Sequence, residues 1–492
     1  MLIGMTDEAK LNKLKKITEK KIDPYPYSYE GKEDISEIVS DFENREGKDA
    51  KIAGRIVGMR KMGSLFFMDI LDGQGKMQAI ARENYLEGKS IELLSLIDIG
   101  DIVGIFGTVT KSKRGEKSID AKEITLLSKS LRVLPEKFHG LKDIEIRYRK
   151  RYLDMIINPN VREYFKTRAR ILRYMRNFLD SRGYIEFETP VLQPVYGGAN
   201  AKPFKTYFNA IDSDVFLRIS DELYLKKLIV GGFEKVYEVS RDFRNEDIDT
   251  THNPEFTIIE CYEAYKDYED YMRMVEEMVG GIAKEILGSN ILTYQGKKLD
   301  FSTPFKRIYF VEELKRKTGI DISGLTDQEA AEIAAKEELK IKVKNRYHVA
   351  DGLFDKYIKS DLQDPTFVVD FPAYMCPLTK DKRGNGKLSE RFELYIAGYE
   401  EANSYSELTN PVEQRKKFME QDAERKKGDD EAPPIDEDFL EAIEFGMPPT
   451  AGLGISIDRI SMILTDNVSL KEVIAFPAAR PEKNRDNGER PE

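Results

Sequence analysis

The alternation of polar and apolar positions is clearest between residues 236 and 262, where it predicts two strands separated by a loop. In the first strand, expected over residues 236–244, side chains two positions apart share a face. One face carries Glu238, Ser240, Asp242 and Arg244, and the same alternation extended past the strand end adds Glu246. The opposite face carries Tyr237, Val239, Arg241 and Phe243. The second strand places Phe256, Ile258, Glu260 and Tyr262 on one face. An antiparallel pair would therefore direct a cation, several acids and aromatic rings toward one surface.

A different pattern fills residues 50–128, where short segments rich in β-branched residues are separated by turn signals. The segments read KIAGRIVGMRKMG, LFFMDILDGQGKMQAIA, DIVGIFGTVTKS and KSIDAKEITLLS. Five short strands within this length predict a small Greek-key barrel of the OB-fold type, which binds single-stranded nucleic acid on one strand face. We expect the barrel domain to occupy residues 46–130.

Helical periodicity organises much of the remaining chain. An apolar period of 3.6 residues predicts a helix over residues 161–179, which Ser181-Arg182-Gly183-Tyr184 ends before an extended segment at residues 185–190. A large domain is expected over residues 151–480, with a helical insertion at about residues 305–345 and a charged helical excursion at residues 411–438. Residues 1–45 are predicted to form an amphipathic helix and its lead-in, and residues 131–150 a charged linker. Residues 481–492 lack aliphatic and aromatic side chains, which predicts disorder.

Composition narrows the possible chemistry. The chain has only two cysteines, Cys261 and Cys376, which excludes a disulfide framework and any multi-cysteine zinc or iron–sulfur site. Its three histidines are scattered, which argues against a histidine-rich metal cluster. Any metal should therefore be a hard cation held by carboxylates, for which Mg²⁺ is the natural candidate. The sequence shows neither a membrane-spanning apolar run nor a signal peptide, so we expect a cytoplasmic protein without a membrane partner.

The net charge of −10 argues against non-specific coating of nucleic acid, so local basic patches matter more than the total charge. One such patch is the first helix, where apolar residues alternate with lysines at helical spacing. These lysines either face a partner, which includes phosphate groups, or form an ordinary solvated helix surface. They are Lys10, Lys13, Lys15, Lys16, Lys20 and Lys21.

The strands of residues 236–262 offer the groups that a nucleoside triphosphate requires. They are a cation (Arg244), a base-edge acceptor (Glu246), a stacking ring (Phe256) and a loop histidine (His252). The run Arg244-Asn245-Glu246, followed by His252-Asn253-Pro254-Glu255-Phe256, resembles motif 2 of class II aminoacyl-tRNA synthetases in the form of the aspartate, asparagine and lysine group.

Two further segments are similar to the other motifs of that class. The helix, glycine and extended Ile185-Glu186-Phe187-Glu188-Thr189-Pro190 resemble motif 1, and Ala451-Gly452-Leu453-Gly454-Ile455-Ser456-Ile457-Asp458-Arg459 resembles motif 3. Ser456 stands where motif 3 usually has a third glycine, which suggests looser packing there or no need for close approach. The P-loop and the G-x-G-x-x-G turn of rival nucleotide folds are missing.

This resemblance implies an α+β protein, with an N-terminal OB-fold β-barrel and a class II catalytic domain whose mainly antiparallel sheet is flanked by helices. The barrel resembles the anticodon-binding domain of lysyl-tRNA synthetases, which implies that Phe67 stacks on anticodon bases while Arg60 and Gln78 form hydrogen bonds with them. Without the resemblance, Phe67 would be expected in the barrel core.

The family also implies roles for residues of the catalytic domain. Its ATP site would comprise Arg244, Asn245, Glu246, His252, Asn253, Phe256, Glu400, Glu401 and Arg459. Arg244 and Arg459 are the expected catalytic residues: Arg244 holds the α-phosphate during in-line attack, and Arg459 lies over the adenine or reaches the outer phosphates. Glu393 and Glu400 match the family's ligands for Mg²⁺.

The expected amino-acid pocket is acidic. The resemblance assigns to it Gly198, Glu222, Glu260, Tyr262, Asn403, Tyr405 and Glu407. Glu222 and Glu407 would address a side-chain ammonium with Tyr262 beside it, while Glu260 and Gly198 would serve the α-amino end. Such a pocket fits a cationic amino acid and rejects aspartate, because like charges in a desolvated pocket cost several kcal/mol.

The chain is thus identified as a member of the lysyl-tRNA synthetases. This implies ATP- and Mg²⁺-dependent activation of L-lysine to lysyl-adenylate, transfer to the 3′ end of tRNA(Lys), and a homodimer. Two alternatives remain open. One is a paralogue that ligates lysine or β-lysine to a protein, a form that typically lacks the N-terminal barrel. The other is a non-catalytic RNA-binding homologue, which the presence of the motif residues disfavours.

Overall fold

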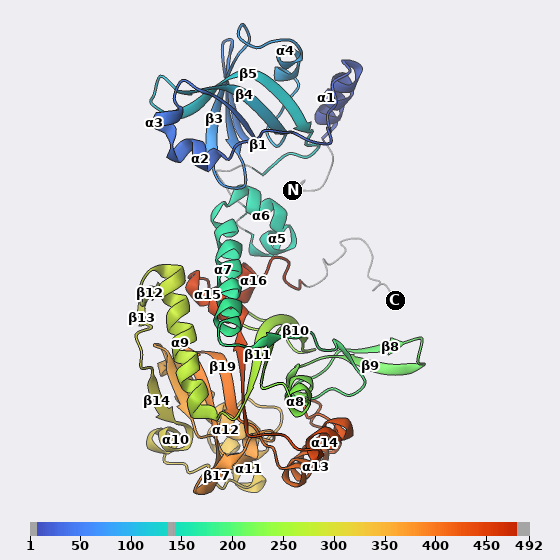
Figure 1. The fold of residues 1–492 in the computed structure, drawn as a ribbon, viewed down its shortest axis with the longest axis vertical. Coiled ribbons are helices and arrows are strands. Elements are labelled where there is room, and N and C mark those ends of the chain that lie inside the picture. The colour runs from blue at the N-terminus through green and yellow to red at the C-terminus, as the bar shows by residue number, and fades with distance from the viewer. Residues whose placement is uncertain (1–6, 136–140, 142, 480–492) are drawn as a thin grey trace. The chain divides into compact units, whose positions relative to one another are not determined.

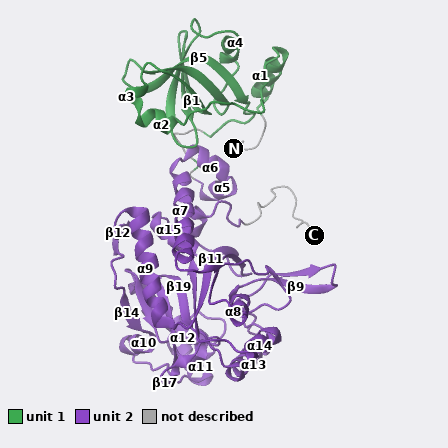
Figure 2. Ribbon diagram, in the orientation of Figure 1, with its two compact units in different colours: residues 1–142 green, residues 143–492 purple. Residues whose placement is uncertain are grey.

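The computed structural model describes residues 7–135, 141 and 143–479. It divides into two compact units, residues 1–142 and residues 143–492 (Figure 2). The division falls inside the predicted linker of residues 131–150, whose last part forms helix α5 (Ile144–Arg149) of the larger unit. The tail predicted to be disordered, residues 481–492, lies outside the described residues. Within the described ranges, no helix combines the length and the apolar character that crossing a bilayer requires.

The smaller unit contains the predicted barrel, which is closed in the strand order β1-β2-β3-β5-β4 (Figure 1). Its strands are β1 (Asp49–Met62), β2 (Leu65–Leu71), β3 (Lys76–Arg82), β4 (Ile102–Lys111) and β5 (Lys117–Ser128). Alternate residues of β2 point inward, so Phe66, Met68 and Ile70 are buried. Phe67 therefore lies on the outer surface, and the expectation of Phe67 as a core residue is wrong because its neighbour Phe66 occupies that place.

Short helices accompany the barrel: α1 (Glu8–Glu19), α2 (Ile35–Ser40), α3 (Phe42–Arg45) and α4 (Lys89–Leu94). Helix α1 is the predicted lysine-rich helix. Ile17, on the apolar face of this helix, is fully buried. The expectation that all of these lysines face outward is wrong for Lys10, whose side chain is buried. Its ammonium donates to the carbonyls of Ile99 (2.8 Å) and Arg132 (3.2 Å). Burial lowers the pKa of Lys10. Lys10 thus fixes α1 to its own unit.

The larger unit is built around an eight-stranded sheet in the order β14-β15-β18-β19-β20-β11-β10-β6 (Figure 1). The strands are β6 (Ile185–Glu186), β10 (Lys235–Phe243), β11 (Glu255–Ala264), β14 (Lys306–Tyr309), β15 (Thr366–Val369), β18 (Arg391–Ile396), β19 (Tyr399–Ser406) and β20 (Thr450–Ser456). Only the edge pairs β14–β15 and β6–β10 are parallel among them, so the mainly antiparallel sheet is confirmed.

Helices cover one face of this sheet. Apolar side chains of β10, β11, β18, β19 and β20 pack beneath α7 (Asn160–Asp180), α9 (Tyr268–Leu287) and α15 (Ile457–Leu464) in one core. Helix α7 is the helix predicted over residues 161–179, and Gly183, at φ +82°, supplies the left-handed conformation that ends this segment. The opposite face of the sheet carries the polar residues that the strand alternation brought together.

Other elements surround the sheet. Helices α10 (Phe310–Thr318) and α12 (Arg346–Tyr357) share a second core with β15 and β18, and α8 (Glu222–Val230) shares a third core with α13 (Pro411–Lys426) and α14 (Glu437–Glu444). The segment predicted as a helical insertion, about residues 305–345, contains α10 and α11 (Asp327–Lys336), but it begins with the edge strand β14. The remaining elements are α6 (Arg151–Ile157), β7 (Leu192–Gln193), β8 (Lys205–Phe208), β9 (Ser213–Leu217), β12 (Ile291–Tyr294), β13 (Lys297–Asp300), η1 (Lys359–Asp361), η2 (Ala373–Met375), β16 (Asp381–Lys382), β17 (Asn385–Ser389) and α16 (Leu470–Val473).

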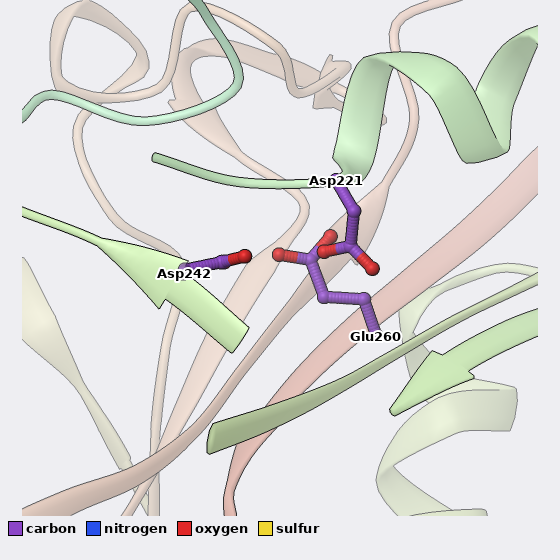
Figure 3. A group of neighbouring side chains, drawn as sticks. All are labelled: Asp221, Asp242 and Glu260. Carbon is purple, nitrogen blue, oxygen red and sulfur yellow. The ribbon is translucent and has the colours of Figure 1, made fainter. Parts of the chain in front are cut away.

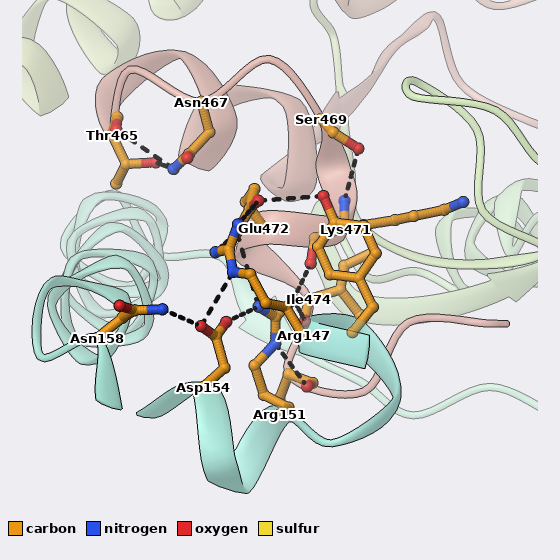
Figure 4. A network of polar contacts seen from close by, with 12 residues as sticks. Arg147, Arg151, Asp154, Asn158, Thr465, Asn467, Ser469, Lys471, Glu472 and Ile474 are labelled. Carbon is orange, nitrogen blue, oxygen red and sulfur yellow. Dashed lines mark hydrogen bonds and ion pairs between the residues drawn. The ribbon is translucent and has the colours of Figure 1, made fainter. Parts of the chain in front are cut away.

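A buried ionic network joins the first helices of this unit to α16 (Figure 4). Arg151 is fully buried, donates to Asp154 (2.8 Å) and reaches backbone carbonyls at the end of α16. Arg147 binds both carboxylate oxygens of Glu472, at 3.0 and 2.8 Å. The first residue of α16, Leu470, donates its N–H to Thr250 O (2.9 Å) in the loop between β10 and β11. The network therefore supports the loop that carries the motif 2 residues.

Candidate functional site

The polar face of the sheet lines a cavity of about 460 Å³. Strands β10 and β11 pair antiparallel with Glu238 opposite Glu260 and Asp242 opposite Phe256, so the predicted shared face is confirmed. Nearly all the residues expected to bind ATP, metal or lysine line this cavity: Gly198, Glu222, Arg244, Glu246, His252, Asn253, Phe256, Glu260, Tyr262, Glu393, Glu400, Glu401, Asn403, Tyr405 and Arg459. Asn245 and Glu407 do not line it. Asn245 is exposed, with its backbone N–H bonded to Lys202 O (2.7 Å).

Arg244 lines the part of the cavity that is predicted to bind the nucleotide. Its guanidinium lies 5.0 Å from the centroid of the Phe256 ring, which holds the cation beside an aromatic plate. The Nε of Arg244 is buried and has no acceptor among the described residues. An unsatisfied buried donor is costly, so an anionic ligand in the cavity would relieve it. The arrangement fits a phosphate group.

The loop between β10 and β11 is held by local contacts. His252 lies at the rim, with Nδ1 2.9 Å from Asp249 Oδ2. Burial opposes ionisation of Asp249, yet the His252 ring and backbone N–H groups lower the pKa of Asp249 to about 2. The Asn253 amide donates to Glu255 O (2.6 Å) and accepts from Ala478 N (3.2 Å), so its side chain also supports the loop.

Arg459 lies in the first turn of α15 and lines the same cavity. Its guanidinium donates to the carbonyl oxygen of Glu400, and Nη1 lies 3.7 Å from the Glu400 carboxylate. The hydroxyl of Ser456 accepts from the backbone N–H of Arg459 (3.2 Å) and caps the helix. A serine at the place of the third glycine therefore does not loosen the motif, because its side chain closes the first turn of α15.

Glu393 and Glu400 form a candidate metal pair. Burial and the charge of Glu400 raise the pKa of Glu393 to about 7. Arg391 donates to Glu393 Oε1 (2.5 Å) and Tyr395 to Oε2 (2.8 Å), which fixes the carboxylate while leaving lone pairs free. Two carboxylates lining the same cavity are the oxygen ligands that a hard divalent cation prefers, so the donor set fits Mg²⁺.

The end of the cavity that is predicted to bind the amino acid is acidic and closely packed. Tyr405 donates to Glu222 Oε2 (2.6 Å), Tyr262 donates to Glu260 Oε2 (2.9 Å), and Ser220 donates to Glu260 Oε1 (3.1 Å). Gly198, at φ +85°, lies so close to Ser220 that a Cβ would stand 2.8 Å from its hydroxyl. Burial, with the charges of Asp242 and Glu222, raises the pKa of Glu260 to about 8. The acids at this end therefore favour a cationic ligand.

Behind Glu260 the structure adds two acids that sequence reasoning did not assign. Oxygens of Asp221, Asp242 and Glu260 lie within 4.8 Å of one another, and Figure 3 shows the carboxylates turned toward each other. Both oxygens of Asp221 are buried without a donor among the described residues, whereas Arg218 lies 3.2 Å from Asp242. Asp242 was on the predicted face, but Asp221 precedes α8 without any motif signal. Of these three acids, Glu260 alone lines the cavity, and Asp221 and Asp242 lie behind it.

Lys226 was also missed. Its ammonium pairs with both Glu222 and Glu407, the two acids predicted to address a substrate ammonium. Glu407 is fully buried behind the cavity wall, which is why it does not line the cavity. The helix sequence ELYLKKLIV contains adjacent lysines, and only packing decides which of them is buried.

On the barrel, Arg60 pairs with Phe67 across β1 and β2, and Gln78 is two residues from Ile80, the partner of Phe67. The three predicted anticodon residues therefore share the outer face. Gln78 is buried there, where it donates to Glu116 (2.9 Å) and accepts from Ser118 (3.3 Å). Their role in anticodon binding stays a prediction.

Comparisons with known proteins cover both units. The family described as tRNA synthetases class II (D, K and N) matches residues 143–480, and the OB-fold nucleic acid binding domain matches residues 50–127. Lysine–tRNA ligase 2 of Methanosarcina mazei is 47% identical over 485 residues, 97% of this chain and 95% of that protein. The lysine–tRNA ligase of Moorella thermoacetica is 46% identical over 478 residues, 96% of this chain and 98% of that protein.

Proposed function

The chain belongs to the class II tRNA synthetases of the aspartate, lysine and asparagine group, and on this premise we propose that it activates lysine with ATP and transfers it to tRNA(Lys). The acidic end of the cavity carries the assignment of the amino acid. Glu222 and Glu260 line that end, each with a tyrosine hydroxyl bonded to it, so a ligand with two ammonium groups fits. A second carboxylate, as in aspartate, would meet these acids without compensation.

In the first half-reaction the lysine carboxylate attacks the α-phosphate of ATP, forming lysyl-adenylate and releasing pyrophosphate. Arg244 would hold the α-phosphate, since its buried Nε lacks an acceptor among the described residues. Phe256 would stack on the adenine, and Arg459 would neutralise charge on the nucleotide. The substrate itself supplies the nucleophile, so positioning and electrostatic stabilisation provide most of the acceleration.

Mg²⁺ would be held by Glu393 and Glu400, and the chemistry it supplies when bound is neutralisation of phosphate charge on the leaving pyrophosphate. Arg391 supports this pair, because it donates to Glu393 and, through Nε, to Asn403 Oδ1 (3.1 Å). The side chain thus links the metal ligands to the amino-acid pocket.

In the second half-reaction the terminal adenosine of tRNA attacks lysyl-adenylate, in this class typically through its 3′-hydroxyl, so that the lysyl ester forms and AMP leaves. Anticodon bases would meet the outer face of the barrel at Arg60, Phe67 and Gln78, by stacking and hydrogen bonding.

We further propose a cytoplasmic homodimer. In support, the segment of residues 185–233 exposes apolar side chains that a second copy would cover: Ile185, Val191, Leu192, Tyr207, Phe208 and Phe233. Both cysteines are unpaired, which suits a reducing compartment.

The test is amino-acid-dependent pyrophosphate exchange followed by charging of total tRNA. We expect exchange with lysine and transfer of lysine to tRNA. Exchange without tRNA charging would favour the protein-ligating paralogue, and the absence of exchange with every amino acid would favour the RNA-binding homologue. Sedimentation of the full chain checks the dimer.

A further inference from the structure

Arg391 lies between a residue of the candidate metal pair and a residue of the amino-acid pocket. Strands β18 and β19 pair antiparallel with Glu393 directly opposite Asn403, and Arg391, two positions before Glu393, lies on the same face. Its Nη2 donates to Glu393 Oε1 (2.5 Å), and its Nε donates to Asn403 Oδ1 (3.1 Å). All three residues line the cavity. One guanidinium therefore bonds to a group expected to bind the metal and to a group expected to bind the amino acid.

The guanidinium is also held on its other sides. Its Nη1 donates to Cys376 Sγ at 3.5 Å, and its central carbon lies 4.6 Å from the centroid of the Phe371 ring. Only 15% of the Arg391 side chain and 9% of the Glu393 side chain are exposed. The donors of a guanidinium are fixed in one plane, so this group cannot follow a movement of one acceptor without changing its bond to the other.

The amide of Asn403 is oriented by this contact. A guanidinium can only donate, so the oxygen of the amide faces Arg391 and the Nδ2 group is left for another partner. Within the ranges that the structure describes, Nδ2 makes no hydrogen bond. It is therefore available to a carboxylate oxygen of a bound amino acid. Such a ligand would fix the amide and, through Oδ1, the guanidinium that bonds to Glu393.

We propose that Arg391 couples the binding of lysine to the binding of the divalent cation, because it holds Asn403 and Glu393 in one arrangement. Lysine on Asn403 then orders the Glu393 carboxylate before the cation binds, and the cation orders Asn403 before lysine binds. The conformational freedom of the shared bridge is lost only once, so each ligand should strengthen the binding of the other by the same factor. Arg391 is thus a positioning residue, and this inference rests on the proposed activation of lysine.

The coupling is measured by calorimetric titration of lysine into the full chain, saturated with a non-hydrolysable methylene analogue of ATP, with and without saturating Mg²⁺. The coupling factor is the ratio of the two Kd values for lysine. We expect about fivefold or more for the wild type, with tighter binding in the presence of Mg²⁺. Titrations at about pH 8 keep the Glu393 carboxylate, whose pKa is about 7, mostly ionised.

Two variants break the bridge from its two sides. Arg391→Lys keeps a positive charge beside Glu393, but a single ammonium lacks the fixed pair of donors, so the coupling factor should fall below about twofold. Asn403→Ala leaves the bond between Arg391 and Glu393 in place and should lower the factor to the same level. A merely structural role of Arg391 would weaken both Kd values for lysine together and leave their ratio unchanged.

Tyr395→Phe is the matched control. The Tyr395 hydroxyl donates to Glu393 Oε2 (2.8 Å), so its loss also removes a hydrogen bond from the metal ligand, but outside the bridge to Asn403. Its coupling factor should stay within about twofold of the wild-type factor, even if more Mg²⁺ is needed for saturation. Thermal melting checks the folding of each variant, and Asn403→Ala alone decides if Arg391→Lys does not fold.

The possible failures are distinguishable. A wild-type chain that binds no lysine in either titration would refute the proposed function. A wild type that binds lysine with a coupling factor below about twofold, or bridge variants that keep the wild-type factor, would overturn this inference alone.

Discussion

Gly452 in β20 forms part of the wall between the glycine-rich strand and the amino-acid pocket. A Cβ at this position would stand 2.1 Å from Glu407 Oε1 and 2.3 and 2.7 Å from two atoms of the Tyr262 ring. Carbon contacts are most favourable at about 3.5–4.0 Å, so Gly452→Ala must displace both side chains by about 1 Å or more. Overpacking of this kind costs about 1–3 kcal/mol, which corresponds to about a 5- to 150-fold effect on an equilibrium.

We expect Gly452→Ala to raise the KM for lysine within that range and to change the KM for ATP much less, because the displaced groups belong to the amino-acid end. The backbone of Gly452 is not left-handed, so alanine introduces no conformational strain of its own. Gly454→Ala in the same strand is the comparison. Its Cβ would meet the flexible end of Ile258 at 3.2 Å and Glu260 Cγ at 3.8 Å, so a smaller rise in the lysine KM is expected. Equal effects of the two variants, or a Gly452→Ala enzyme with an unchanged lysine KM, would show that the wall is not where the structure places it.

Three further predictions concern charge. Glu222→Gln should raise the KM for lysine about 10- to 150-fold in the exchange assay while the KM for ATP stays within about threefold, since hydrogen bonds to charged groups are worth about 1.5–3 kcal/mol; equal losses for both substrates would contradict its role. Arg151→Met should lower the free energy of unfolding by about 3–5 kcal/mol in urea, because it removes a cation from a fully buried network; a change below about 1 kcal/mol would contradict this. Glu260 keeps its proton to about pH 8 in the folded chain against 4.5 usually, so its contribution to stability is full below pH 4.5 and is lost as the pH rises toward 8. Glu260→Gln should therefore gain stability relative to the wild type between pH 5 and 8, and melting curves that stay parallel across that range would refute the shift.

The strands of the site were predictable because alternation is a local signal. Glu238, Ser240 and Asp242 share a face with Glu260 and Tyr262 once the two strands pair in register. The roles expected of Arg244 and Arg459 rest on their motifs and stay predictions, but the place of both residues in the cavity follows from the same local signals. These parts of the site depend on neighbours in the sequence, which is why they could be assigned before the structure.

The parts that were missed depend on packing between distant segments. Lys226 and Lys227 are equivalent in the sequence, but the helix turns the first toward Glu407 and the second toward Asp438. Phe66 and Phe67 differ by one position, and the barrel interior takes the first. Lys10 is buried by carbonyl groups of residues about a hundred positions away. In each case the local pattern permits both orientations, and only the tertiary fold selects one.

The buried acids of the pocket lower the stability of the folded protein, and a bound cationic ligand would restore that stability. Asp221 is fully buried with neither oxygen bonded to a donor among the described residues, and the side chains of Asp242 and Glu260 lie close to it. Burial and these charges raise the pKa of Asp221 well above its usual value. Lysine carries two ammonium groups, one for each acidic end of the pocket, so its binding would supply the charges that the free protein lacks. A group that binds only the folded state stabilises that state, so the acids that destabilise the empty pocket would also favour a ligand with two ammonium groups.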